Sequence, residues 1–326
     1  MWNSYTLTCG SIKIKRISEC PAWKSLTEVK KALMIKIRLK EITMLAMLGL
    51  FFIILCYVAG YYVIVPALVC LAYGLIEPYW IESKEIYFTS EKIPDSFDNF
   101  KIVFISDIHH GAVYSRKRLK TLVNRVNALQ PDLILLGGDY IDQSKYIQSC
   151  FDEFKNLHTE YGVYGVLGNH DHFAGANMVA NAMNKAGIIC IDNKSYWLTK
   201  GSEKIKIGGV GDYWNDIQDL HATIKDTKPD DFVILLSHNP DYAEEIKTDK
   251  VDLVLSGHTH GGQATIFGLW APFIPSKFGQ KYKTGLIKTP YTEILVSNGI
   301  GNVGYIPIRF FARPQINIIY LKRIIV

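Results

Sequence analysis

The feature that most constrains this chain is a run of 35 residues without a charged side chain, from Ile42 to Ile76. A membrane-spanning helix needs roughly 20 apolar residues, so this run predicts a transmembrane segment. A cleaved signal peptide fits less well, because its apolar region reaches only about 15 residues. The length of the run suits either one span or a tight hairpin, in which Gly60 and Pro66 would interrupt the helix.

Positive charge is concentrated before this run. Residues 1–40 contain nine Lys or Arg and two Glu, an excess of seven, whereas the whole chain has a net charge of +5, which leaves about −2 for the remainder. A basic excess confined to the flank of an apolar run is typical of a membrane-orienting segment, so we expect a cell-membrane location and no nucleic-acid partner. One crossing would place the following domain outside the cytoplasm, and two would keep it inside.

Four segments follow from these patterns. We expect a basic N-terminal flank (1–41), the transmembrane segment (42–76), a polar strand or connector (77–100) and a folded catalytic domain (101–326). Translation could begin at Met1 or at Met34, which directly precedes the basic sequence IKIRLK.

From residue 101 onward, short apolar runs alternate with polar clusters. The runs 102–105 and 133–136 are too short for buried helices and suit strands that are buried on both faces. Residues 116–129 between them have a helical pattern. Strand, helix and strand in this order predict an α/β fold.

Five of the predicted strands are followed by side chains that can bind metals or transfer protons. The ends of strands are where α/β proteins collect their sites. Two divalent cations about 3.5 to 4 Å apart can promote phosphoester hydrolysis, and mixed oxygen and imidazole ligands can hold them. The side chains are Asp107, His109, Asp139, Asn169, His170, His238, His258 and His260.

The spacing within two of these clusters suggests how they converge. In an extended chain, residues i and i+2 point to the same face. We therefore expect Asp107 and His109 to turn toward one ion from an extended backbone, with His258 and His260 in the same relation.

Taken together, the motifs DxH, GD, GNHD, a lone His and GHxH resemble, in this order, the calcineurin-like metallophosphoesterases over roughly residues 100–320. The segments GHTHGGQ (257–263) and NGIGNVGYIPIRFFARPQI (298–316), with the apolar N-terminus, resemble a membrane-associated branch. That branch includes proteins of the YkuE and YaeI type and the chlamydial-type UDP-2,3-diacylglucosamine hydrolases.

The resemblance implies a four-layer αββα sandwich and a role for each motif residue. Asp107, His109 and His260 would bind the first of two divalent ions. Asn169, His238 and His258 would bind the second, and Asp139 would bridge both. His170 would act as the general acid, with Asp171 orienting or charging its imidazole.

We therefore expect a membrane-anchored enzyme that hydrolyses a phosphodiester or pyrophosphate bond with two ions of Mn, Fe or Zn. The substrate would be a phosphorylated small molecule or a lipid-linked or cell-envelope compound such as UDP-2,3-diacylglucosamine. One alternative is a broad-specificity phosphodiesterase or phosphatase that is merely located at the membrane. A non-catalytic metal-binding scaffold is another, but such a protein usually lacks a ligand or the general acid, and neither is missing.

A late cluster of aromatic and basic residues, 305–313, has two interpretations. Phe310 and Phe311 could enter a membrane interface while Arg309 and Arg313 meet phosphates. The alternative is a plain core strand.

Overall fold

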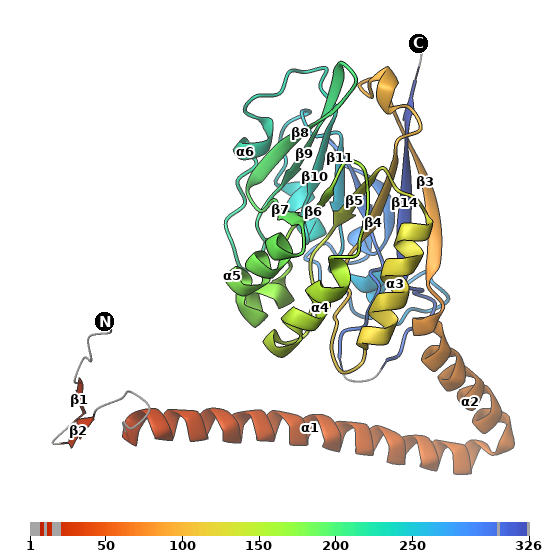
Figure 1. The fold of residues 1–326 in the computed structure, drawn as a ribbon. Helices are drawn as coiled ribbons and strands as arrows, with labels where there is room; N and C mark the ends of the chain where they lie inside the picture. The colour runs from red at the N-terminus through yellow and green to blue at the C-terminus, as the bar shows by residue number, and fades with distance from the viewer. Residues whose placement is uncertain (1–6, 10–11, 15–20, 305–306, 325–326) are drawn as a thin grey trace. The chain divides into compact units, whose positions relative to one another are not determined.

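The computed structural model describes residues 7–9, 12–14, 21–304 and 307–324 (Figure 1). The chain divides into two compact units, Met1–Cys70 and Leu71–Val326. The alternative start at Met1 and the aromatic Tyr305 lie outside the described residues.

The first unit contains the long helix α1 (Pro21–Ala59) and a short antiparallel pair, β1 (Leu7–Cys9) and β2 (Ile12–Ile14). Helix α2 (Tyr61–Ile76) follows, and its last residues belong to the second unit. Gly60 separates the two helices with φ of 65°, a conformation that glycine adopts without strain.

The prediction of a break at Gly60 is therefore confirmed, whereas the predicted break at Pro66 is wrong, because Pro66 lies inside α2. Apolar helices tolerate proline where neighbouring groups satisfy the freed carbonyl. Two stretches, Glu28–Tyr57 and Tyr62–Tyr79, are long and apolar enough to cross a membrane by length and composition.

The second unit is built on two six-stranded sheets. The first sheet has the order β3-β14-β4-β5-β6-β7, in which only the β14–β4 pair is antiparallel. Its strands are β3 (Glu82–Ser90), β4 (Lys101–Ile105), β5 (Leu133–Leu136), β6 (Val163–Gly165), β7 (Ile188–Cys190) and β14 (Gln315–Arg323).

The second sheet has the order β12-β13-β11-β10-β9-β8, and its two edge strands, β12 and β8, are antiparallel to their neighbours. Its strands are β8 (Lys194–Lys200), β9 (Glu203–Gly209), β10 (Val233–Leu236), β11 (Leu253–Ser256), β12 (Gly285–Lys288) and β13 (Glu293–Val296).

Apolar side chains alternate between the two faces of each central strand. In β4, Ile102 and Phe104 enter the core between the sheets, while Val103 and Ile105 face the helices. Burial on both faces is what the sequence predicted for this strand.

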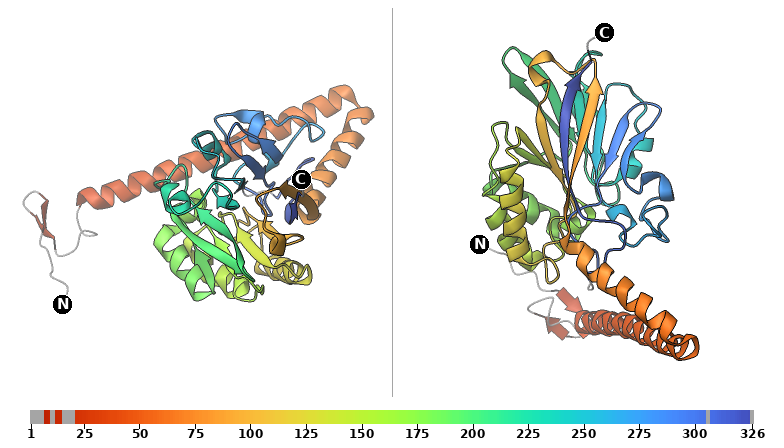
Figure 2. Two further views of the ribbon diagram at one scale, coloured as in Figure 1. Left: turned by 90° about the horizontal axis from the view of Figure 1, so that it is seen from above. Right: turned by 90° about the vertical axis from the view of Figure 1, so that its right-hand side faces the viewer.

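The helices cover the sheets unequally. The first sheet carries α3 (Arg116–Ala128), α4 (Ile147–Phe154) and α5 (Asn169–Lys185), seen on one side in Figure 2 (right). The second sheet is covered by α6 (His221–Ile224) and by turns such as Pro240–Glu244. The predicted sandwich with two sheets is confirmed, with short helical pieces in its second outer layer.

Residues 77–100, expected as a strand or a connector, contain β3. This strand pairs in parallel with β14 over nine residues, from Glu82 opposite Gln315 to Ser90 opposite Arg323. The compact unit that holds the sandwich therefore takes in these residues as well.

Candidate metal centre

The candidate ligands come together because the parallel strands of both sheets end at one place. Asp107 and His109 follow β4, Asp139 follows β5, and Asn169 with His170 opens α5 after β6. From the second sheet, His238 follows β10, and His258 and His260 follow β11. The structure thus assembles one cluster from the strand ends of two sheets.

The local backbone differs from the extended geometry that the sequence predicted. Asp107, His109, His258 and His260 have φ of 52°, 47°, 68° and 53°, and Asp139 has 54°. The i and i+2 argument for a shared face is therefore wrong, since these residues lie in the left-handed region. Non-glycine residues are uncommon there and concentrate at functional sites.

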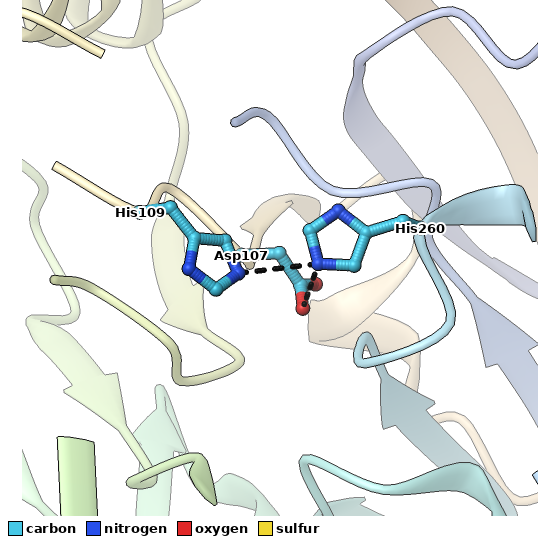
Figure 3. A group of neighbouring side chains, drawn as sticks. All are labelled: Asp107, His109 and His260. Carbon is cyan, nitrogen blue, oxygen red and sulfur yellow. Dashed lines mark hydrogen bonds and ion pairs between the residues drawn. The ribbon is translucent and has the colours of Figure 1, made fainter. Parts of the chain in front are cut away.

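Asp107, His109 and His260 form the first group of ligand atoms. The Nε2 atoms of His109 and His260 are 3.2 Å apart, and Nε2 of His260 lies 3.4 Å from Oδ1 of Asp107. Figure 3 shows the two imidazoles facing each other beside the carboxylate. All three side chains are buried, and their ligand atoms lie within 4.8 Å of one another.

Asn169, His238 and His258 form the second group. Oδ1 of Asn169 lies 3.2 Å from Nε2 of His238 and 3.0 Å from Nδ1 of His258. Between the groups lies Oδ2 of Asp139, 3.6 Å from Nε2 of His109 and 3.3 Å from Nε2 of His238. The structure therefore brings all seven candidate ligands together, with Asp139 between the two groups.

The hydrogen bonds made by Nδ1 of His238 and of His109 show whether the cluster is suited to bind cations. Nδ1 of His238 lies 2.7 Å from the carbonyl of Gly137, and Nδ1 of His109 lies 3.0 Å from Oδ1 of Asp142. Each acceptor requires a proton on Nδ1, so a neutral imidazole turns the bare Nε2 lone pair inward. Lone pairs then face carboxylate and amide oxygens with no proton between them, and a cation suits this donor set.

Charge at the shared carboxylate agrees with this arrangement. Burial raises the pKa of Asp139, but positive charge beside its carboxylate, carried by His238 and His109 when they are protonated, outweighs burial and holds this pKa well below its ordinary value. Asp139 is therefore an anion placed between the two groups. Its other oxygen, Oδ1, accepts a hydrogen bond of 2.8 Å from the backbone N–H of His170.

His170 lies where it can reach both the ligands and solvent. Its ring is partly exposed, lines the cavity described below and contacts the ring of His109 edge-on, with centroids 4.6 Å apart. Burial lowers its pKa, and Asp139 acts in the opposite direction.

Asp171 points elsewhere than the sequence suggested. Its Oδ2 accepts backbone N–H groups of Asp139 (2.7 Å) and Gly168 (2.9 Å), and its Oδ1 accepts that of Tyr140 (3.0 Å). Burial and the charge of Asp139 raise its pKa to about 8, while the N–H groups of Gly168 and Tyr140 act in the opposite direction. The carboxylate thus holds the loop of Asp139, and this replaces the expected contact with the His170 imidazole.

A cavity of about 270 Å³ opens beside the cluster. Asp139, Asn169, His170, His258 and His260 form its polar floor. The remaining walls are largely apolar and consist of Trp214, Thr259, Gly262, Gln263, Phe273, Pro275 and Val303. The cavity therefore combines a polar floor with a mostly apolar wall.

The position of Arg309 contradicts the interpretation that its guanidinium group meets a phosphate. Its side chain is fully buried and donates to the carbonyls of Gly301 and Ala312, with Nη2 3.4 Å from Nδ1 of His260. It stays in the interior because backbone carbonyls satisfy its donors. Phe311 remains 39% exposed.

Sequence reasoning missed two further residues at the site. Asp142 orients His109, and Trp214 packs edge-on against His258 with centroids 4.3 Å apart. The signal for Asp142 was available in principle, because a ligand histidine usually donates its second N–H to a carboxylate or carbonyl. Nothing in the spacing of Trp214 indicates its contact.

Comparison with known proteins decides the family. The family model of the calcineurin-like phosphoesterases matches residues 100–262. The chain belongs to this family. It is a metallophosphoesterase, and its clustered His and Asp side chains agree with the divalent metals that the family uses.

Three relatives set the closer context. The chain is 35% identical to the uncharacterized metallophosphoesterase YkuE of Bacillus subtilis, over 76% of this chain and 87% of the relative. It is 29% identical to phosphodiesterase YaeI of Escherichia coli, over 75% and 90%. A transmembrane protein with a metallophosphoesterase domain from Danio rerio is 29% identical, over 72% of this chain and 55% of its own length. These similarities agree with the YkuE and YaeI branch of the family.

Proposed function

We propose that this metallophosphoesterase is attached to the cell membrane, binds two divalent cations and hydrolyses phosphodiester or pyrophosphate bonds. The observation that carries the proposal is Oδ2 of Asp139, which lies between two groups of inward-facing acceptor atoms. When bound, the two ions would neutralise the phosphoester oxygens and activate a water molecule.

Each group would hold one ion. Asp107, His109 and His260 would bind the first, Asn169, His238 and His258 the second, and Asp139 both. This mixture of carboxylate, amide and imidazole ligands suits Mn, Fe or Zn.

The protein's own side chains would handle the proton. His170 is the partly exposed imidazole at the cavity, so it would protonate the leaving-group oxygen. Asp171 would act indirectly, because its carboxylate holds the backbone on which Asp139 is mounted.

Membrane attachment is supported by the two apolar helices and by the Danio rerio relative, which is named a transmembrane protein. An enzyme at this location meets phosphoesters at the bilayer surface. We therefore propose a lipid-linked or cell-envelope substrate, for which UDP-2,3-diacylglucosamine is the first compound to test.

A second candidate is a broad-specificity phosphodiesterase that is only located at the membrane. The Escherichia coli relative, named a phosphodiesterase, favours it. Under this alternative, the membrane helices determine location and contribute nothing to substrate choice.

The full chain, purified in detergent and freed of metal by chelation, tests these proposals. We expect hydrolysis to return on addition of Mn²⁺, Fe²⁺ or Zn²⁺, with higher kcat/KM for UDP-2,3-diacylglucosamine than for a chromogenic phosphodiester. Activity on the chromogenic ester alone would favour the second candidate. No hydrolysis of either compound with any of the three ions would contradict both.

A further inference from the structure

Large apolar side chains cluster on one loop of the sandwich, residues 264–273. Ile266, Phe267, Leu269, Trp270 and Phe273 are exposed by 55%, 73%, 81%, 49% and 73%. Soluble proteins rarely expose contiguous apolar surface of this kind unless it meets a partner or a membrane. A partner or a membrane is therefore expected to cover this loop.

The 264–273 loop is held in this conformation from below. The backbone N–H of Ile266 donates to the carbonyl of Trp270 at 2.7 Å. The side-chain amide of Gln280 both accepts from the N–H (3.2 Å) and donates to the carbonyl (2.7 Å) of Ala271, and Lys283 donates to two carbonyls of the turn. The apolar side chains are thus presented by a formed turn.

The loop lies at the entrance to the metal centre. Phe273 lines the cavity together with Trp214 and Val303, and the ligand His258 forms part of the same cavity's floor. Whatever covers the loop therefore also lies beside the entrance through which a substrate reaches the ligands.

The exposed surface continues from the loop toward the end of α2. The ring of Phe267 contacts that of Phe311 (centroids 5.5 Å apart), which contacts Tyr73 in the last turns of α2 (5.1 Å). Tyr73 belongs to the same compact unit as the loop. Its helical neighbours Leu75 and Ile76 are 39% and 62% exposed. This apolar surface therefore extends to a helix that is apolar enough to enter a bilayer.

Charge and aromatic residues favour a lipid surface as the partner. Residues 257–292 contain four Lys and no Asp or Glu, and two of these, Lys281 and Lys288, form ion pairs with Glu244 and Glu293. After α2, the guanidinium group of Arg118 stacks on the exposed ring of Tyr79, 4.3 Å from its centroid. That of Arg313 stacks on the exposed ring of Trp80 at 4.2 Å. Aromatic and basic side chains together are typical of the membrane interface, and basic ones are attracted to anionic lipids.

We propose that the 264–273 loop inserts its apolar side chains into the surface layer of an anionic lipid bilayer, so that the cavity of the metal centre opens at the depth of the headgroups. A phosphoester whose apolar part remains in the bilayer would then reach the ligands directly. The inference rests on the membrane attachment in the proposed function and adds a second contact to it.

Fluorescence of Trp270 tests the insertion without any need for activity. The full chain is reconstituted in vesicles of phosphatidylcholine and phosphatidylglycerol with bromine at shallow positions of the acyl chains, and the signal of Trp270→Phe is subtracted from that of the parental chain. We expect the difference spectrum to be blue-shifted and quenched by bromine. A red-shifted, unquenched difference spectrum would place Trp270 in water and overturn the proposal.

A pair of substrates tests the functional consequence. The double variant Phe267→Ser, Leu269→Ser changes two exposed side chains outside the cavity lining. We expect it to lose at least about tenfold in kcat/KM toward p-nitrophenyl hexadecyl phosphate held in vesicles, since two apolar side chains no longer enter the bilayer. Hydrolysis of water-soluble p-nitrophenyl methyl phosphate should stay within about twofold, because only bilayer contact is removed.

The matched control is Tyr87→Ser, which removes a 57% exposed aromatic side chain from β3 and should leave both rates unchanged. Equal losses of the double variant on the two substrates, or no loss on either, would overturn the proposal. So would a change from dimer to monomer in detergent caused by the double variant, because a second copy of the chain would then cover the loop. If the parental chain hydrolyses neither ester with any ion, the proposed function fails, while the quenching result stands independently.

Discussion

The two halves of the candidate metal centre are oriented by different parts of the molecule. In the first half, His109 is held by a side chain, the carboxylate of Asp142, which is 29% exposed. In the second half, His238 is held by a backbone carbonyl, that of Gly137, and is completely buried. A point substitution of Asp142 can therefore lower the metal affinity of the first half without changing a ligand. In the second half the supporting group is a backbone carbonyl, so only a substitution of the ligands or of the residues packed against them can lower its affinity.

The largest expected effect comes from the residue that the halves share. Asp139→Ala removes the carboxylate between them, so we expect the loss of both ions and a fall in kcat/KM of roughly 10⁴-fold or more, since each ion contributes several kcal/mol. Metal content after equilibrium dialysis and hydrolysis of a chromogenic phosphodiester measure the two effects. Retention of one tightly bound ion would show that the halves do not depend on a common ligand.

The next largest effect is expected from removal of the His170 imidazole, which belongs to neither group of ligands. His170→Ala should keep both ions and lower kcat by about 10²- to 10⁴-fold, because general acid catalysis is removed while the ligands stay in place. His158→Ala, which removes an exposed imidazole on the surface, is the matched control and should keep full activity. Hydrolysis by His170→Ala at the parental rate would refute its role as the acid.

Removal of the metal should affect both halves at once. With the ions gone, the inward-facing acceptor atoms lose their partners, and the folded state loses the free energy of metal binding. At a free metal concentration 100 times Kd this amounts to about 2.7 kcal/mol per ion. We expect the thermal unfolding midpoint of the full chain to fall on chelation and to return with Mn²⁺, by roughly 2 to 4 °C per kcal/mol. An unchanged midpoint would argue against cations at this site.

The side-chain support of the first half gives the sharpest test of the comparison. Asp142→Ala should weaken the first ion about 10- to 100-fold, as is usual when the hydrogen-bond partner of a ligand histidine is removed, and should leave the second ion in place. Electron paramagnetic resonance at limiting Mn²⁺ would then show an isolated ion, whereas we expect two coupled ions in the parental protein. Equal weakening of both ions would mean that the halves are not supported separately.

The smallest expected effect is on the second half. Trp214 packs edge-on against His258, and Trp214→Leu keeps an apolar wall while removing the aromatic contact. Such contacts contribute about 0.5 to 1.5 kcal/mol, so we expect the affinity for the second ion to fall roughly threefold to tenfold. Titration of the protein with Mn²⁺ measures the affinity for the second ion, and the affinity for the first ion serves as the internal control.

The same contrast explains what the sequence could predict. The clustering of the candidate ligands was predictable because each follows a strand that is recognisable as a short apolar run, and parallel strands end at a common edge. The supports were less predictable. Asp142 and Arg309 act on His109 and His260 across 33 and 49 positions of the chain, so their roles depend on packing that no local pattern encodes.

The backbone at the ligands was predicted wrongly for a physical reason. An extended strand end explains how Asp107 and His109 could share a face, but both adopt left-handed conformations instead. Local preference disfavours this, and only the surrounding tertiary contacts hold it, such as the N–H of His258 on Oδ1 of Asp107 at 2.9 Å. Sequence patterns therefore predicted which candidate ligands come together and misjudged their backbone conformation.

The pairing of β3 with β14 has a consequence for biosynthesis. β14 lies between β3, which leaves the ribosome soon after α2, and β4, and it is the last strand of the fold. During translation, β3 and β4 must wait with unpaired edges until more than 200 further residues have been made, and such edges invite pairing with other chains. The apolar helices are available for membrane insertion throughout this interval. Insertion would therefore precede the completion of the first sheet and with it the assembly of the catalytic domain.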